Sequence, residues 1–443
     1  MDKEIVREIL TAPYGKTPLR FAKQFRYLQS ILGDGLVTME GPDWMRHRSI
    51  LQPAFLAQAL KETLNGVVPP RATKLVEFWK MAGAEREIDV ASHLSALTLD
   101  VIGAAAFSHN FDALKSIERW AKADTDDPEH SKLEDLDDPT IQAFTQLFTF
   151  TWIGTISFAF NQPWISRYFN PRTVNGRKAL DVGVDAVVAN AKKKRHEETA
   201  ANGRKNTKSL LQIMMEAKND GSTSKKWLDD TELRDEAKTF IFAGHETTST
   251  WCYQAIYSLC QYQDVQEKVY QDIAKHVKPR EPITLERVES MEYFTAFLQE
   301  VLRMYPPIGA FQRVSTKTES FGTKYKIWPG TRLLVSIYTL HHHPKYWKNP
   351  ETFSPERWIF DSDEEKEQFF ADIRFAFLPF SAGGRNCIGQ RFATIEAKLI
   401  LAELIRSFVF QVAPSQSDTK FTLTSFVALK TKPRLKVVVK ERK

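Results

Sequence analysis

Residues 380–389 read FSAGGRNCIG, and a helical pattern of apolar side chains follows them from 390 to 408. The cysteine in this stretch, Cys387, stands just before that helix, where the positive end of the helix dipole favours a thiolate. Glycines on both sides of Cys387 allow the backbone to bend closely around the sulfur and to point amide groups at it. Hydrogen bonds from such groups tune a metal–thiolate bond. The stretch therefore predicts a thiolate ligand for a metal.

The alternative for Cys387 is a buried structural cysteine on an ordinary glycine-rich turn. For a lone cysteine that alternative is the more frequent one, because free cysteine is among the most buried residue types. Here the phenylalanine, the glycines and the arginine of residues 380–389 all stand at fixed offsets from the cysteine. This combination favours the metal-ligand interpretation.

The composition excludes several classes of protein. The chain has 443 residues, of which 42% are hydrophobic, so it is neither disordered nor fibrous. Its 61 basic and 55 acidic residues leave a net charge of +6, which is too small and too scattered to indicate a nucleic-acid partner. The more modest interpretation of this positive charge is a basic surface that docks an acidic partner protein. With only three cysteines we expect no disulfide framework and a reducing compartment.

Long segments with helical periodicity dominate up to about residue 310, and shorter strand-like segments follow. Polar stretches at 121–138, 199–208 and 218–226 predict surface loops. Helices first and strands late, without βαβ alternation, predict one mainly α (α+β) domain over residues 1–443 rather than a parallel-sheet protein. The predicted helices are 44–60, 94–107, 179–198, 229–260, 293–305 and 390–408, and the predicted strands lie in 325–327, 332–337 and 421–439.

The predicted helix 229–260 carries an unusual sequence in its middle, AGHETT at 243–248. A mid-helix glycine costs about 1 kcal/mol relative to alanine, and two adjacent threonines add smaller penalties. Local rules broken inside a long helix often mark a functional site, although a tolerated packing glycine explains Gly244 equally well. A zinc-protease helix is excluded, because it needs a histidine four residues after His245, where Ser249 stands.

Two further motifs lie nearer the C-terminus. Glu300 and Arg303 stand one helical turn apart, and residues 355–358 read PERW. An isolated charge pair with this spacing contributes only about 0.2–0.5 kcal/mol, so the pair by itself indicates little. Three consecutive histidines at 341–343 invite a metal hypothesis. Consecutive side chains point in different directions, however, and we assign no metal to them.

Taken together, these motifs resemble the cytochrome P450 family in its eukaryotic microsomal type. Residues 380–389 match the family's haem-ligand signature at every defining position. The resemblance implies the P450 fold, which is helix-rich with small late β-sheets, and Cys387 as the proximal ligand of a haem iron. It also implies that Phe380, Arg385 and Gly389 contribute to haem binding. A thiolate increases the electron density on iron and favours O–O cleavage.

The resemblance extends to the middle of the helix at 229–260. It implies that Gly244 leaves room for dioxygen, that Thr247 hydrogen-bonds the distal oxygen, and that Glu246 relays protons from solvent. Proton delivery to that oxygen is needed before the O–O bond breaks heterolytically. The resemblance further implies a buried structural network that fixes the haem loop and consists of Glu300, Arg303 and Arg357.

Haem has two carboxylates, which need cationic or donor partners. Trp44 and Arg48 lie four residues apart, on one face of a predicted helix, and they match an early tryptophan–arginine pair of the family. Arg313 lies where related sequences offer another arginine, and Arg385 belongs to the haem loop itself. A surface helix with a half-buried tryptophan is the alternative for Trp44 and Arg48.

Substrate contacts are expected from the resemblance around 240–243, 308–311 and the turn 425–429. These segments are mostly apolar or aromatic, which suits a lipophilic ligand and equally suits plain core. The haem loop most resembles the fatty-acid-hydroxylating branch, in which a haem-linked glutamate often stands where this chain has alanine, so we expect non-covalent haem b. A fatty acid, a sterol, a terpenoid and a xenobiotic stay open as substrates. The expected pocket residues are Phe240, Phe242, Ala243, Ile308, Phe311 and Phe426.

The expected reaction is NADPH-dependent monooxygenation, in which RH and dioxygen give ROH and water. Electrons are expected from a diflavin NADPH–cytochrome P450 reductase, with cytochrome b5 as a second donor, and the candidate docking contacts are Arg46, His47 and Lys398. Two alternatives stay open. One is a hydroperoxide lyase or isomerase of the same fold, which Glu246 and Thr247 disfavour, and the other is a non-catalytic haem-binding fragment.

The resemblance implies the cytoplasmic face of the endoplasmic reticulum membrane. Residues 1–10 lack an apolar signal or spanning segment, and the most apolar stretch, 147–160, is too short and too polar to cross a bilayer. Relatives reach the helix expected at 2–10 only after an anchor, a hinge, a first helix and two strands. We therefore expect no membrane anchor in this chain, contact with the membrane surface, and a sheet that lacks edge partners.

Overall fold

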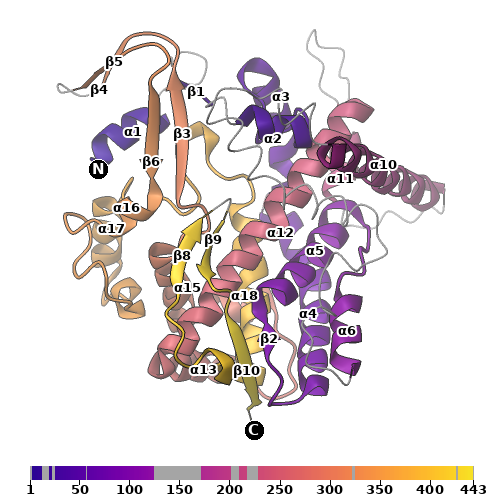
Figure 1. Ribbon diagram of the computed structural model, residues 1–443, viewed down its shortest axis with the longest axis vertical. Helices are drawn as coiled ribbons and strands as arrows, with labels where there is room; N and C mark the ends of the chain where they lie inside the picture. Colours follow the sequence, from indigo (N-terminus) through magenta and orange to yellow (C-terminus); the bar gives the residue numbers. More distant parts are fainter. Residues whose placement is uncertain are drawn as a thin grey trace. The chain divides into compact units, whose positions relative to one another are not determined.

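The structure is a computed structural model that describes residues 2–11, 19–21, 25–55, 57–123, 171–200, 209–216, 228–321, 325–425 and 428–442 (Figure 1). Most of the predicted loops and the apolar stretch 147–160 lie outside these residues. The chain forms two compact units. The first consists of Met1–Phe21, Ala72–Leu94 and Thr247–Lys443, and the second of Ala22–Arg71 and Ser95–Glu246.

Three long helices have residues in both units: α4 (Ala57–Ala82), α5 (Val90–Phe107) and α12 (Asp230–Gln261). The predicted helices at 94–107 and 229–260 are confirmed by α5 and α12. Helix α5 is long and apolar enough to cross a membrane by length and composition alone, but 89% of it is buried inside the protein. A buried core helix explains that apolar composition equally well.

Helices and 3-10 turns are the regular secondary structure in the described residues of the second unit, and one predicted helix in it is wrong. The segment predicted as a single helix at 44–60 is broken, because Pro53 lacks a backbone N–H and its ring clashes with the preceding turn. One helix ends at Leu51, a short 3-10 turn covers Gln52–Phe55, and α4 begins at Ala57. The other elements are α2 (Phe25–Leu32), α3 (Gly41–Leu51), η1 (Gln52–Phe55), α6 (Leu114–Lys122), α10 (Pro171–Ala200) and α11 (Leu210–Glu216).

The helices of the first unit include the two that carry the sequence motifs. Helix α15 (Glu292–Met304) contains Glu300 and Arg303, and it ends where Pro306 and Pro307 disfavour helical backbone. Helix α18 (Gln390–Ser407) follows the cysteine loop and is buried on all sides along most of its length. The remaining helices and turns are α1 (Lys3–Thr11), α13 (Gln263–His276), α14 (Leu285–Glu289), α16 (Ile337–His341), η4 (Pro355–Trp358), α17 (Asp363–Asp372), η5 (Gly383–Arg385) and η6 (Pro414–Gln416).

Small antiparallel sheets complete the first unit, in the orders β1-β3-β6, β2-β10-β7, β4-β5 and β8-β9. In the first sheet Arg313 stands opposite Leu333, and β1 covers one edge of β3. The predicted strand at 325–327 is confirmed. Three strands lie within or begin in the segment 421–439, for which strands are predicted. The strands are β1 (Leu19–Phe21), β2 (Ile88–Asp89), β3 (Ala310–Ser315), β4 (Glu319–Phe321), β5 (Tyr325–Ile327), β6 (Arg332–Ser336), β7 (Phe408–Val412), β8 (Thr422–Ser425), β9 (Leu429–Lys432) and β10 (Lys436–Glu441).

Candidate functional site

The cysteine loop is a tight turn tied to itself by backbone hydrogen bonds. The Cys387 N–H donates to the Phe380 carbonyl across 2.9 Å, and the Asn386 N–H donates to the Gly383 carbonyl across 3.1 Å. Gly383 has a φ of 74° and Ser381 a φ of 59°, so the turn passes twice through left-handed backbone. These bonds hold Cys387 three residues before α18, near the positive end of that helix.

The three cysteines differ in their surroundings. Cys387 is exposed, whereas burial raises the pKa of the Cys252 and Cys260 thiols well above the usual range. A buried thiol of raised pKa is a poor source of thiolate. Among the described residues no group of three or more histidine, cysteine or acidic side chains is arranged to hold a metal ion. Of the three cysteines, Cys387 is therefore the one suited to act as the single thiolate ligand of a haem iron.

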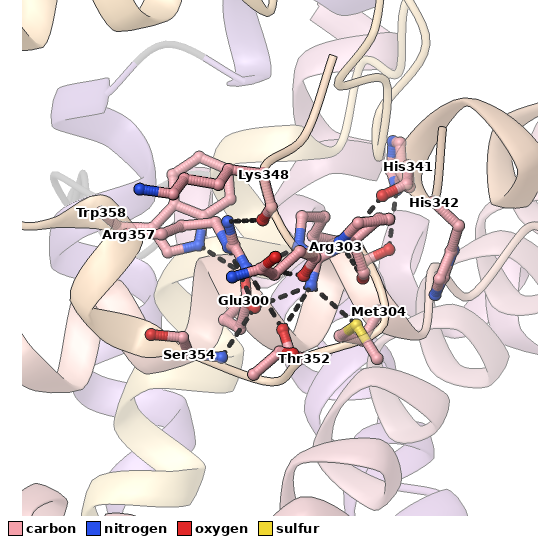
Figure 2. Close-up of polar contacts among 12 residues, drawn as sticks. Glu300, Arg303, Met304, His341, His342, Lys348, Thr352, Ser354, Arg357 and Trp358 are labelled. Carbon is pink, nitrogen blue, oxygen red and sulfur yellow. Dashed lines mark hydrogen bonds and ion pairs between the residues drawn. The ribbon is translucent and has the colours of Figure 1, made fainter. Parts of the chain in front are cut away.

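The predicted ionic network around Glu300 is present and buried in the first unit (Figure 2). Arg303 donates from Nε to Glu300 Oε2 at 2.9 Å and from Nη2 to Glu300 Oε1 at 2.8 Å. Arg357 Nε donates to Glu300 Oε1 at 3.2 Å, and Trp358 Nε1 donates to Oε2 at 2.9 Å. Each Glu300 oxygen thus accepts several hydrogen bonds, which offsets the cost of burying its charge.

His341 connects this network to the cysteine loop, a role that sequence reasoning did not assign. Arg303 Nη1 donates to the His341 carbonyl at 2.9 Å, and His341 Nδ1 lies 3.1 Å from the Arg303 carbonyl. The Leu378 N–H donates to His341 Nε2 at 2.8 Å, so Nε2 is the acceptor and Nδ1 carries the proton. Burial lowers the pKa of His341 to about 3. The side chain is a neutral structural bridge that ends two residues before Phe380.

Helix α1 also contacts the loop within the first unit. A Cβ atom placed on Gly383 would lie 2.0 Å from the Leu10 carbonyl oxygen. Val6 and Leu10 pack with Leu340 and Leu378 in one apolar cluster. The absence of a side chain at position 383 therefore allows both the left-handed turn and the close approach of α1.

Helix α12 begins with a capping box. The Glu232 N–H donates to Asp229 Oδ1 at 3.0 Å, and the Asp229 N–H donates to Glu232 Oε2 at 2.9 Å, which is a reciprocal capping box. Farther along, the Thr98 hydroxyl of α5 donates to the His245 carbonyl at 3.0 Å. A side chain that bonds a carbonyl in the middle of a helix is a recognised cause of local bending.

The predicted catalytic residues lie along α12. A Cβ atom on Gly244 would lie 2.9 Å from two side-chain atoms of Ile102, so this glycine permits close packing of α5 against α12 in the second unit. Glu246 is partly exposed, and its carboxylate lies 4.0 Å from His245 Nε2. Thr247, half-buried, is the first residue of α12 that belongs to the first unit.

Helix α3 carries the predicted tryptophan–arginine pair in the second unit. Trp44 is buried and Arg48 is half-buried. Between them, Arg46 contacts Glu232 and donates to His47 Nε2 at 3.0 Å, and His47 Nδ1 hydrogen-bonds Glu236 Oε1 at 2.7 Å. His47 and Glu236 are fully buried, and burial raises the pKa of Glu236 despite that bond.

Two of the predicted docking contacts are therefore wrong. His47 faces α12 and is 0% exposed, so it presents nothing to a partner protein. Lys398 is 8% exposed, and its ammonium donates to Thr295 Oγ1 at 2.8 Å. The sequence pattern could not distinguish these buried basic residues from surface ones, because their partners are distant in the chain.

The predicted pocket residues are divided between the two units. In the second, Phe240 is buried against Phe55 with ring centroids 5.6 Å apart, whereas Phe242 and Ala243 are half-buried. In the first, Ile308 and Phe311 are half-buried, and the Arg313 guanidinium lies 4.9 Å from the Phe311 ring centroid. Phe426 lies outside the described residues.

Comparison with known proteins agrees with this geometry. Residues 1–438 match the family model described as Cytochrome P450. Cytochrome P450 4Z1 of Homo sapiens is 30% identical over 427 residues, which cover 95% of this chain and 78% of that protein. Cytochrome P450 4A10 of Rattus norvegicus is 28% identical over 422 residues, which cover 94% and 76%. A crystal structure of the cytochrome P450DA heme domain has a TM-score of 0.77 at 24% identity and covers 100% of this chain and 86% of that one, which shows a shared fold.

Proposed function

This chain belongs to the cytochrome P450 family, and we propose that Cys387 is the thiolate ligand of its haem iron. The protein is a monooxygenase that inserts one oxygen atom of O2 into a lipophilic substrate, with non-covalent haem b and electrons from NADPH through a reductase. One observation carries the assignment of the ligand: Cys387 is exposed just before α18, whereas Cys252 is buried, Cys260 is half-buried, and desolvation raises the pKa of both of those thiols.

The reduced carbon-monoxide difference spectrum tests this ligand. A thiolate-bound haem gives a strongly red-shifted Soret band, which we expect in the native protein and expect to be lost in Cys387→Ser. Cys260→Ser is the matched control, because that thiol is held protonated by burial and should leave the band unchanged. A band that survives in Cys387→Ser contradicts the assignment.

We propose that the haem carboxylates are bound by Arg313, Arg385, Trp44 and Arg48, and that Phe380 and Gly389 shape the loop on which the haem rests. Guanidinium and indole N–H groups are suitable donors for carboxylates. When bound, the haem supplies oxygen activation. Replacing Arg48 or Arg313 by leucine should lower the haem content of the purified protein, measured by its absorbance per mole of chain.

The residues proposed for proton handling are Glu246 and Thr247. The partly exposed Glu246 carboxyl can take a proton from solvent, and the Thr247 hydroxyl can pass a proton on and donate a hydrogen bond. Gly244 is proposed to leave the space for dioxygen. Thr247→Ala and Glu246→Gln should release more hydrogen peroxide per NADPH consumed, whereas a passive haem binder would be indifferent to both changes.

We propose a long-chain fatty acid as the first substrate to test, with Phe240, Phe242, Ala243, Ile308, Phe311 and Phe426 as the pocket. This rests on the apolar character of those residues and on the likeness of the haem loop to the fatty-acid-hydroxylating branch. A sterol and a terpenoid are the comparison substrates. Fatty-acid-dependent NADPH consumption with a hydroxylated product is the expected result, and its absence alongside turnover of a comparison substrate would redirect the assignment.

The reductase is proposed to be a diflavin enzyme that docks beside the cysteine loop, with cytochrome b5 as a second donor. Arg391, in the first turn of α18, and Arg374, shortly before the loop, are exposed and replace the buried His47 and Lys398 as proposed contacts. Arg391→Glu should raise the reductase concentration needed for half-maximal turnover, because an acidic partner would then meet a like charge. Lys440→Glu, exposed on β10, is the control.

A membrane surface at the endoplasmic reticulum is proposed as the location. Tyr325, Trp328 and Leu334 are 57%, 59% and 59% exposed, and they lie on or beside β5 and β6 (Figure 1). Lys326 lies 5.9 Å from the Trp328 ring centroid. Aromatic rings beside basic side chains suit the headgroup region of an anionic bilayer. Trp328→Ser should weaken sedimentation with vesicles that contain phosphatidylserine, and Leu423→Ser, 36% exposed on β8, should not.

A further inference from the structure

Two buried polar side chains join helices α3 and α12 of the second unit, and the proposed reaction uses neither. His47 and Glu236 are both 0% exposed, and His47 Nδ1 hydrogen-bonds Glu236 Oε1 at 2.7 Å. His47 Nε2 lies 3.0 Å from Arg46 Nη2. Because a guanidinium can only donate, Nε2 is the acceptor, and the proton of a neutral His47 is on Nδ1. The bond to Glu236 is therefore donated by His47.

A second contact runs parallel to the first. Arg46, the residue before His47, forms an ion pair with Glu232, which lies one helical turn before Glu236 on α12. Residues four apart share one face of a helix, so two adjacent side chains of α3 bind two neighbouring acids on one face of α12. One contact alone would allow α3 to turn about it. Two contacts fix both the rotation of α3 and its position along α12.

Stability alone does not explain the buried His47–Glu236 pair. Replacing a buried polar pair by apolar residues of similar volume is often neutral or stabilising, because the pair loses its hydration when it is buried. The second oxygen of Glu236, Oε2, has no hydrogen-bond partner of ordinary geometry among the described residues. A directional hydrogen bond selects one orientation of a helix, which an apolar contact does not. The pair therefore suits a role in orientation.

We propose that His47 and Glu236 are positioning residues, whose bond holds α3 in the one rotation that directs its donors at the haem carboxylates. The inference rests on the proposed role of Trp44 and Arg48 as those donors. Trp44 lies one turn before His47 on the buried face of α3, and Arg48 is the next residue after His47. At about 6 Å from the helix axis, a rotation of about 30° moves a side-chain end by about 3 Å, the length of a hydrogen bond. A turn of that size would separate both donors from a carboxylate.

A double variant tests the positioning without leaving a buried group unpaired. His47→Leu combined with Glu236→Leu should unfold at a urea concentration close to that of the native holoprotein. It should retain the thiolate-type carbon-monoxide band, because Cys387 is unchanged. Its haem should nevertheless transfer to apomyoglobin about tenfold faster, as expected for the loss of a hydrogen bond to a charged group. The carboxylate bending bands in the resonance Raman spectrum of the haem should shift.

Two matched variants separate positioning from stability. Glu236→Gln keeps an oxygen that accepts from His47 Nδ1, so it should show native haem transfer and native carboxylate bands. Ile50→Ala removes apolar contacts from the same buried face of α3. It should lower the urea midpoint through the cavity it leaves, and it should leave the carboxylate bands unchanged.

Arg48→Leu distinguishes a failure of this inference from a failure of the function on which it rests. If Arg48→Leu shifts the carboxylate bands and the double variant does not, the positioning role is wrong and the carboxylate role of Arg48 stands. If Arg48→Leu leaves the bands unchanged, the proposed carboxylate role is wrong and the inference fails with it. A double variant that no longer folds would show a pair required for stability, which also overturns the proposal.

Discussion

His341 Nε2 accepts a hydrogen bond from the Leu378 backbone N–H across 2.8 Å, and this bond joins the Glu300–Arg303 network to the segment that leads into the cysteine loop. The contact spans 37 residues of sequence. Leu378 lies two residues before Phe380, so the bond anchors the backbone that enters the loop. Hydrogen bonds therefore connect the Glu300–Arg303 network to the cysteine loop within the first unit.

We expect His341→Gln to flatten the dependence of stability on pH. The pKa of His341 is about 3 in the folded protein against 6.5 in the unfolded chain, so the unfolded chain binds a proton first as the pH falls. The native protein should therefore lose about 1.4 kcal/mol per pH unit below pH 6.5 from this group. Urea unfolding between pH 8 and 4 measures the slope. His343→Gln, in the half-buried member of the triplet, should leave it unchanged.

Arg303→Lys should be strongly destabilising although it preserves the charge. Arg303 donates to both oxygens of Glu300 and to the carbonyls of His341, Pro350 and Thr352, a pattern that an ammonium group cannot reproduce. We expect a loss of about 3–5 kcal/mol in the free energy of unfolding. Arg357→Lys, 12% exposed, should cost clearly less. Equal effects of the two changes would contradict a network centred on Arg303.

Gly383→Ala should displace α1 and loosen the cysteine loop. The new Cβ would meet the Leu10 carbonyl oxygen at 2.0 Å, and the φ of 74° disfavours any side chain. Strain and overpacking together should cost about 1–3 kcal/mol. Gly384→Ala is a matched control, because nothing lies within 4 Å of its added Cβ. Thermal unfolding and amide hydrogen exchange of Lys3–Thr11 distinguish the two variants.

Gly244→Ala separates a packing role from an oxygen-binding role for that glycine. The added Cβ would lie 2.9 Å from Ile102 Cδ1 and Cγ1, which crowds α5 against α12 in the second unit. A double-mutant cycle with Ile102→Ala should show coupling, so that Gly244→Ala costs less stability when both Ile102 atoms are absent. If the double variant regains its stability but still consumes NADPH without forming product, the role of Gly244 is to leave space for dioxygen.

The predictions that succeeded and those that failed differ in the range of the interactions on which they depend. Helix α12 was predictable because its capping box and its apolar period are local. The break at Pro53 was missed although the proline is visible, because apolar periodicity continues through it. Burial of His47 was not predictable, since it depends on Glu236, which lies 189 residues away.

The sequence by itself determined the family and the Glu300–Arg303–Arg357 set and predicts the ligand cysteine, because each is written as a short pattern of fixed spacing. Only the tertiary structure decided which basic residues are exposed and that His341 joins the network to the loop. Burial and charge pairing are sums over residues far apart in the chain, so no local pattern contains them.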